Sequence, residues 1–373
     1  MIYLDNSATG GFKPSAVIDS AFNTLKYLCA NPGRSGHRLS VTGAELIFDA
    51  RKEISELVNC SIERVAFTKN CTESLNTAIF GLYKKGGHVI TTVYEHNSVL
   101  RPLYHLEKLG LISLSVVSPN GQDIVSAINE KINHKTCLVV TTALSNVTGD
   151  RLPIKAIGRL CKAKKIKYIV DGAQAGGHIP LDIKNDYIDA LCLAGHKGLY
   201  GIMSSGVLAF NDDVDISPLT FGGTGIETFN LSQPDCYPEK LESGTLNLPA
   251  IASLKEGVYY VKKNLNNFQY VLEGYVNKTI DALNDIKGVK VYSKPNTAGI
   301  VSFEFNDLDS ETASDIYNKE FDIAVRGGFH CAPLIHKFLG TEKNGLVRAS
   351  FSPHNSLREL SSFIKATEKI ANS

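Results

Sequence analysis

The sequence contains no tryptophan, only 2 methionines and no C-x-x-C pair among its 8 cysteines. It also lacks a clustered set of cysteine and histidine ligands, so we expect reduced thiols, no metal site and no disulfide framework. No apolar run approaches the roughly 20 residues of a membrane-spanning helix, and the amino terminus lacks the basic segment and apolar core of a secretion signal. These absences predict a cytoplasmic protein without a membrane partner.

The sequence also lacks an excess of positive or negative residues. The chain has 39 lysines and arginines against 38 aspartates and glutamates, a net charge of +1, which gives no reason to expect nucleic acid as a partner. With 43% hydrophobic and 21% charged residues, the composition is that of an ordinary globular protein. A length of 373 residues corresponds to roughly two domains of about 150 residues each.

Short apolar runs alternate with helical patterns through the first two thirds of the chain. The runs predict strands at 64–67, 87–93, 112–117, 136–142, 167–171, 190–193 and 205–210. The patterns between and before them predict helices at 16–28, 45–58, 98–109, 124–132 and 154–164. This β-α alternation is typical of an α/β fold with a mostly parallel sheet.

The composition changes at Pro249, where a long helical region of about 250–286 begins. Beyond it the sequence predicts strands at 289–292, 299–305 and 323–325, a helix at 310–319, and a last helix opened by the capping box Ser356 to Glu359. We therefore expect a large domain at 15–250 and a smaller α+β domain formed by 1–14 and 251–373.

Two stretches of the large domain carry the clearest chemical signal. Lys197 follows an apolar run and Gly195-His196, and lysine is the usual amine for Schiff-base chemistry. Asp171 ends a run that reads as a buried strand, where ligands of open α/β sheets lie. Considered alone, the lysine is most simply interpreted as a surface charge and the aspartate as a turn residue. Together with Gln174, they form the arrangement that a pyridoxal phosphate (PLP) enzyme needs.

With these residues the sequence resembles the class V aminotransferases, and within them the cysteine desulfurases, from Tyr3–Thr9 to Val347–Ser350. The resemblance implies the PLP-dependent transferase fold of type I, with PLP as the cofactor. It implies that Lys197 holds the cofactor, that Asp171 keeps the ring nitrogen protonated, and that Gln174 hydrogen-bonds the phenolate oxygen.

Other residues join the site through the same resemblance. His96 follows a strand, and its default reading is a structural histidine; the family places this imidazole on the cofactor ring. His196 is expected among the cofactor-binding residues. Asn146 follows the 136–142 strand and is placed to reach the phenolic oxygen or the substrate carboxylate.

The phosphate is expected at a strand-to-helix turn, where unpaired backbone N–H groups bind anions. Cys71 and Thr72 would supply the contact, unless Thr72 is only a helix cap. The family has two small hydroxyl residues there, so Cys71 is a departure. Arg34 and His37 lie in a loop that either connects helices or approaches an anionic ligand. The family places the residue corresponding to Thr245 on the neighbouring subunit's phosphate, which implies a homodimer with shared sites.

Cys331 lies between His330 and Ala332, after two glycines and before Pro333, on an irregular or mobile segment. One cysteine among eight is by itself most simply structural. A nearby histidine and arginine favour a thiolate, and the resemblance makes Cys331 the desulfurase nucleophile, which ordinary class V aminotransferases lack. Arg326 is expected to order this segment and to contribute to substrate binding.

Arg348 lies in a predicted strand, so a buried guanidinium there needs an acidic partner. Taken alone, it reads as either an internal salt bridge or a ligand-binding residue. In the family this arginine binds the substrate α-carboxylate through two parallel hydrogen bonds.

The expected reaction converts L-cysteine to L-alanine. Lys197 moves the α-proton, the Cys331 thiolate takes the sulfur as a persulfide, and a sulfur-acceptor protein removes it. Three positions depart from the family pattern. Ala194 replaces a phosphate-binding serine, at a cost of about 1 kcal/mol; the Met203 region lacks a proline; and Phe329 replaces a second histidine beside Cys331.

Other readings remain open at this stage. Selenocysteine lyase, cysteine sulfinate cleavage and amino-group transfer belong to the same group of enzymes. The departures at Ala194 and Met203 also allow a cofactor-binding scaffold with little catalysis.

Overall fold

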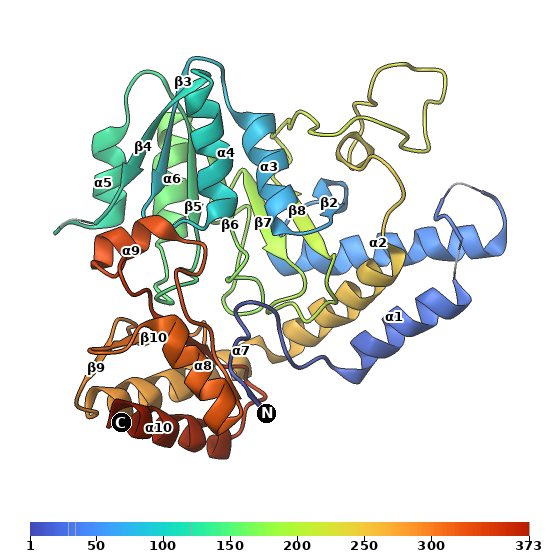
Figure 1. Ribbon diagram of the computed structural model, residues 1–373. Helices are drawn as coiled ribbons and strands as arrows, with labels where there is room; N and C mark the ends of the chain where they lie inside the picture. Colours follow the sequence, from blue (N-terminus) through green and yellow to red (C-terminus); the bar gives the residue numbers. More distant parts are fainter. Residues whose placement is uncertain (29, 34, 120, 373) are drawn as a thin grey trace.

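The computed structural model describes residues 1–28, 30–33, 35–119 and 121–372. Within these residues, seven strands form the large sheet in the order β2-β8-β7-β6-β5-β3-β4 (Figure 1). Strands β4, β3, β5, β6 and β7 run parallel, and β8 pairs antiparallel with both β7 and β2. The strands are β2 Val65–Thr68, β3 Gly87–Thr92, β4 Ile112–Val117, β5 Thr136–Thr142, β6 Lys167–Asp171, β7 Ala190–Ala194 and β8 Gly206–Phe210.

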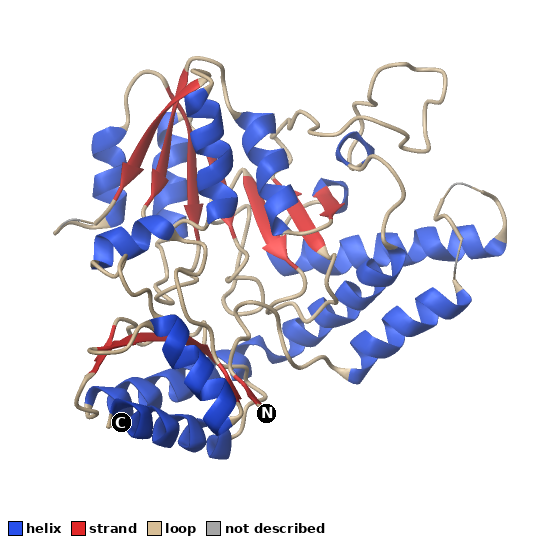
Figure 2. Ribbon diagram, in the orientation of Figure 1, coloured by secondary structure: helices blue, strands red, loops and turns tan. Residues whose placement is uncertain are grey.

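Helices cover both faces of this sheet (Figure 2). They are α2 Arg38–Val58, α3 Cys71–Leu82, α4 Asn97–Lys108, α5 Ile124–Lys131 and α6 Ile154–Lys164. Successive strand residues point to opposite faces. Tyr168 and Val170 of β6 therefore pack in the cluster that includes α2, α5 and α6, whereas Ile169 packs in the cluster of α3 and α4. Burial on both faces explains why the strands read as continuous apolar runs.

The second part of the fold is built around a smaller antiparallel sheet, β12-β10-β9. Its elements are β9 Val289–Val291, β10 Ile300–Phe305, α8 Ser310–Phe321, β11 Ile323–Ala324, α9 Pro333–Leu339, β12 Val347–Ser350 and α10 Leu357–Ala371. The N-terminal strand β1, Ile2–Tyr3, pairs parallel with β11. The chain's first residues therefore lie beside its last third.

One long helix, α7 Leu248–Asn284, runs between the two parts (Figure 1). Asn247 caps its first turn by accepting a hydrogen bond from Ala250 N. Its first half packs in the large core and its second half, from Leu272, in the core of the small sheet. Helix α1, Ser15–Tyr27, packs along it.

The expected fold class is confirmed: an α/β structure with a mostly parallel central sheet and a smaller α+β part. Two local predictions were wrong. Helix α2 begins at Arg38, seven residues earlier than predicted, because His37 caps it by accepting from Ser40 N. Helix α9 was not predicted, although it follows Cys331 directly. None of the described helices is both long and apolar enough to cross a bilayer.

Candidate active site

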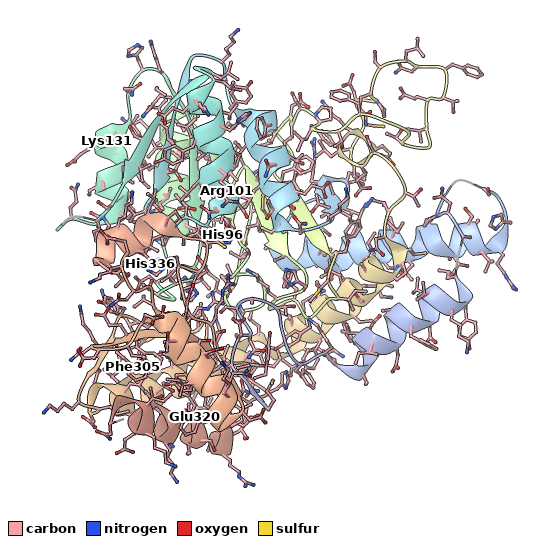
Figure 3. The ribbon with its side chains drawn as sticks, viewed as in Figure 1. His96, Arg101, Lys131, Phe305, Glu320 and His336 are labelled. Carbon is pink, nitrogen blue, oxygen red and sulfur yellow. The ribbon has the colours of Figure 1, made fainter. Side chains whose placement is uncertain are left out.

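The predicted site residues meet at the carboxyl ends of the parallel strands. Asp171 ends β6, Lys197 follows β7 and His96 precedes α4. In the view of Figure 3, His96 lies near α9. The three residues line one cavity of about 90 Å³. Its walls include these predicted cofactor residues: Cys71, Thr72, His96, Asn146, Asp171, Gln174, His196 and Lys197.

Lys197 is half-buried in a tight turn after β7. Its N–H donates to Ala194 O, and its own carbonyl accepts from Tyr200 N. Burial lowers the pKa of the Lys197 amine, and the Asp171 charge opposes this effect. A lowered pKa increases the fraction of neutral amine, which is the nucleophilic form of lysine.

Asp171 lies across the cavity floor and is 3% exposed. Its Oδ1 accepts a hydrogen bond from Ala173 N at 2.9 Å and one from the Cys71 thiol at 3.6 Å. Burial raises the pKa of Asp171, while these donors and the Lys197 charge act to lower it. Burial and the Asp171 charge raise the pKa of Cys71 well above its usual range, so this thiol stays protonated and acts as a donor.

The start of α3 forms another wall of the cavity. The helix cap is Asn70, whose side chain accepts from Glu73 N, so Thr72 is not the cap. Among the described residues, no acceptor takes the N–H groups of Cys71 and Thr72. The Thr72 hydroxyl contacts Ser98 Oγ at 2.8 Å. This helix end is therefore open to an anion.

His96 is neutral near pH 7. Burial, followed by the charges of Lys197 and the two arginines Arg326 and Arg348, lowers its pKa to about 4. The ring Nδ1 accepts from Ser98 N at 3.0 Å, which leaves the proton on Nε2. A neutral, fixed imidazole at the cavity edge is suited to stacking on a ring.

The segment around Cys331 is irregular but held in place. His330 and Cys331 have φ angles of 49° and 56°, in the left-handed region. The His330 carbonyl accepts from Asn146 Nδ2 at 2.8 Å, and the Cys331 carbonyl accepts from Asn97 N at 2.7 Å. These hydrogen bonds join the segment to the cavity wall and to the start of α4.

The Cys331 side chain is exposed, and Arg326 Nη2 lies 3.9 Å from its sulfur. It lines a groove of about 460 Å³ between α3 and α4, together with His96 and Thr72. Since His96 and Thr72 also line the Lys197 cavity, groove and cavity adjoin. The Cys331 thiol is therefore accessible from the groove.

Arg348 is 1% exposed, and of its two possible roles the structure shows the internal salt bridge. It forms an internal ion pair with Asp5, Nη2 to Oδ1 at 2.8 Å, and its Nη1 donates to Asn146 O. Its Nε is buried, and no described residue accepts a hydrogen bond from it. Backbone hydrogen bonds in both directions place Arg326 directly beside it.

Two other predicted residues, Thr245 and His37, lie outside the cavity. Thr245 lines a separate cavity of about 230 Å³ with Thr68 and Lys69. His37 caps α2. Arg34 lies outside the described residues.

Local sequence patterns did not predict several contacts of the first residues. The first residues cover the Lys197 turn: Gly10 N and Lys13 Nζ each lie 3.0 Å from His196 O. Gln174 Nε2 donates to Ser7 O. Only the position of Tyr3–Thr9 in the resembled family pointed this way. Among the described residues, no group of histidine, cysteine and carboxylate side chains is arranged to bind a metal ion.

Comparisons with known proteins agree with this geometry. The family model described as Aminotransferase class-V matches residues 2–363. A protein of Pyrococcus abyssi named "Probable cysteine desulfurase" is 34% identical, over 100% of this chain and 95% of that protein. One of the same name from Methanothermobacter thermautotrophicus is 30% identical, over 99% and 94%. The solved apo structure of a cysteine desulfurase from Thermococcus onnurineus NA1 superposes with a TM-score of 0.91 at 31% identity, over 100% of this chain and 94% of that one.

Proposed function

Since the chain belongs to the class V aminotransferase family, we propose that it is a PLP-dependent cysteine desulfurase. It converts L-cysteine to L-alanine and keeps the sulfur as a persulfide on Cys331. The observation that carries the proposal is the exposed Cys331 thiol, which lies beside Arg326 in a groove that adjoins the Lys197 cavity.

The donor set of the cavity fits PLP. The cofactor has an aldehyde, a pyridine nitrogen and a phosphate, and the cavity offers an amine, a carboxylate and a helix N-terminus for them. Lys197 would hold the aldehyde carbon, Asp171 the ring nitrogen, and the α3 start at Cys71 and Thr72 the phosphate. Ala194 lines the same cavity without a hydroxyl, so we expect weaker phosphate binding than in relatives with serine.

When bound, PLP withdraws electrons from the substrate's α-carbon. Residues of the chain transfer the proton and bind the cofactor and the substrate. The neutral Lys197 amine takes the α-proton, and Asp171 would hold the ring nitrogen and balance its positive charge. His96 would stack on the ring, and Gln174 and Asn146 would hold the cofactor's oxygen and the substrate.

Arg348 binds the substrate α-carboxylate through its unpartnered Nε–H edge. The Cys331 thiolate, supported by Arg326, attacks the substrate sulfur. One S–S bond forms, the substrate Cβ–S bond breaks, and its electron pair returns to the carbon skeleton, which is protonated and released as L-alanine.

The persulfide then needs an acceptor. Because hydrogen bonds from Asn146 and Asn97 hold the Cys331 segment, we infer that a sulfur-acceptor protein brings its thiol to the groove. A homodimer is proposed from the location of Thr245 in a separate cavity and from the fully exposed Phe229 and Leu231 of the preceding segment. A cytoplasmic location and the domain limits at residues 14 and 250 stay predictions.

The test measures products from L-cysteine with dithiothreitol. We expect equal amounts of alanine and sulfide from the wild type, and neither from Cys331→Ser. Cys236→Ser is the matched control, since Cys236 is also free and exposed but does not line the cavity or the groove.

Other outcomes would point to other reactions. Alanine release that persists in Cys331→Ser contradicts the proposal. Amino-group transfer to a keto acid, or a reaction with selenocysteine or cysteine sulfinate alone, would favour another member of the family. Cofactor binding without any turnover would favour a scaffold.

A further inference from the structure

Asp5 belongs to no catalytic group described above, yet it is the ion-pair partner of Arg348. Their closest atoms, Oδ1 and Nη2, lie 2.8 Å apart. The Arg348 side chain is 1% exposed and that of Asp5 is 23% exposed. The pair is formed by residues 343 positions apart in the sequence.

The remaining donors of Arg348 show which edge of the guanidinium is free. Nη1 donates to Asn146 O at 2.9 Å, whereas Nε is buried and has no hydrogen-bond partner among the residues that the structure describes. An unpaired buried donor of a charged group is costly. An incoming carboxylate that accepts from Nε removes this cost, which makes the Nε edge the expected docking edge for the substrate.

The backbone at Asp5 is held against β12, the strand that carries the arginine. It forms a parallel bridge to Ser350, two residues beyond Arg348 on β12. Leu4 O accepts from Ser350 N at 2.6 Å, and Asp5 O accepts from Ala8 N at 3.0 Å. The main chain at Asp5 is therefore held in place beside Arg348 when a second carboxylate arrives.

The segment that carries Asp5 also contacts the cofactor residues. Ser7 O accepts from Gln174 Nε2 at 3.0 Å, and Gly10 N donates to His196 O at 3.0 Å. Residues 5–10 thus connect Arg348 with the Lys197 turn, so the orientation of the arginine is tied to that of the cofactor cavity.

We propose that Asp5 is a positioning residue for substrate recognition: it holds the Nη2 end of Arg348 so that the Nε edge faces the substrate α-carboxylate. The substrate joins Asp5 on the guanidinium and does not displace it. This inference rests on the proposed function, because it assigns the α-carboxylate to Arg348.

The test compares Asp5→Ala and Asp5→Asn with the wild-type holoenzyme. Asp5→Ala loses the hydrogen bond that orients Arg348, so we expect KM for L-cysteine to rise about tenfold, the effect of about one charge-assisted hydrogen bond. We expect kcat to change less than about threefold, because Asp5 does not touch the reacting atoms. Asp5→Asn keeps an acceptor oxygen and should stay within about threefold of the wild-type KM.

Two controls separate positioning from a structural role. Binding of L-alanine, followed by the cofactor's absorbance, should weaken about as much as KM rises, whereas binding of ethylamine, which lacks a carboxylate, should not change. Asp322→Asn is the matched variant, because Asp322 pairs with the Met1 amine at the other end of the N-terminal strand, and its KM should equal the wild-type value. Asp5→Glu, which displaces the carboxylate by one methylene, should raise KM severalfold. It replaces Asp5→Ala in the test if that variant does not fold.

Opposite results overturn the proposal. A lower KM in both Asp5→Ala and Asp5→Asn would show that Asp5 competes with the substrate for Arg348. An unchanged KM in Asp5→Ala and Asp5→Glu would show no role, and an equal loss of ethylamine binding would show a structural one. If the wild type makes no alanine from L-cysteine, the proposed function fails, while the L-alanine and ethylamine titrations still test Asp5.

Discussion

Glu95 is a buried acid that the proposed reaction does not use, and it predicts a measurable pH dependence of stability. It is 0% exposed and directly precedes His96. Thr92 Oγ1 donates to its Oε1 at 2.6 Å, while no donor within the described part of the chain pairs with Oε2. Burial raises the pKa of Glu95 from 4.5 to about 8, and the nearby Asp171 charge adds to the rise.

The sign and size of the effect follow from these values. The unfolded chain loses the Glu95 proton above pH 4.5, whereas the folded protein keeps it up to about pH 8. The stability that burial of the neutral Glu95 side chain allows is therefore fully present below pH 4.5. The free energy of unfolding then falls as the pH rises to 8. At 1.36 kcal/mol for each pH unit, the loss over the whole interval is roughly 4 to 5 kcal/mol.

Glu95→Gln removes this titration while keeping the shape of the side chain. We expect the variant and the wild type to differ little near pH 5. The variant should then gain relative stability by about 1.4 kcal/mol per pH unit up to about pH 8. Urea unfolding of the cofactor-free proteins at pH 5 to 9 measures the difference, in which all shared titrating groups cancel. Parallel stability curves for the two proteins across this range would refute the reasoning.

Two further predictions concern the cofactor. Ala194→Ser adds a hydroxyl to the cavity wall, so the Kd for PLP should fall about tenfold, as one hydrogen bond to a charged group implies; an unchanged Kd in a fluorescence titration would mean that the hydroxyl does not reach the phosphate. Lys197→Ala removes the amine, so the yellow band of the lysine-bound cofactor should be absent after PLP addition. A retained band would place the cofactor on another amine.

The sequence predicted the central elements well because each has a strong local signal. The strands at 112–117, 136–142 and 167–171 have the predicted limits, since apolar runs there are bounded by turn residues. Helix α9, at Pro333–Leu339, lacks such a signal, because it is only seven residues long and follows an irregular segment.

The residues of the candidate site likewise divide into those with a local sequence signal and those without one. Lys197 and Asp171 stand out in the sequence, because each follows a buried strand in a recognisable motif. The pairing of Asp5 with Arg348 has no local signal, since it depends on how the segment after β1 comes to lie beside β12. The hydrogen bonds that hold Cys331 likewise come from Asn97 and Asn146, more than 180 residues away in the sequence.

The most direct test of the account is the mass of the intact protein after incubation with L-cysteine and no reductant. We predict the addition of one sulfur atom, located by peptide mapping on Cys331 and removed by dithiothreitol. Cys236→Ser should gain the same mass, and Cys331→Ser should gain none. A protein that releases alanine without carrying added sulfur, or that carries it equally in Cys331→Ser, would contradict a desulfurase mechanism based on Cys331.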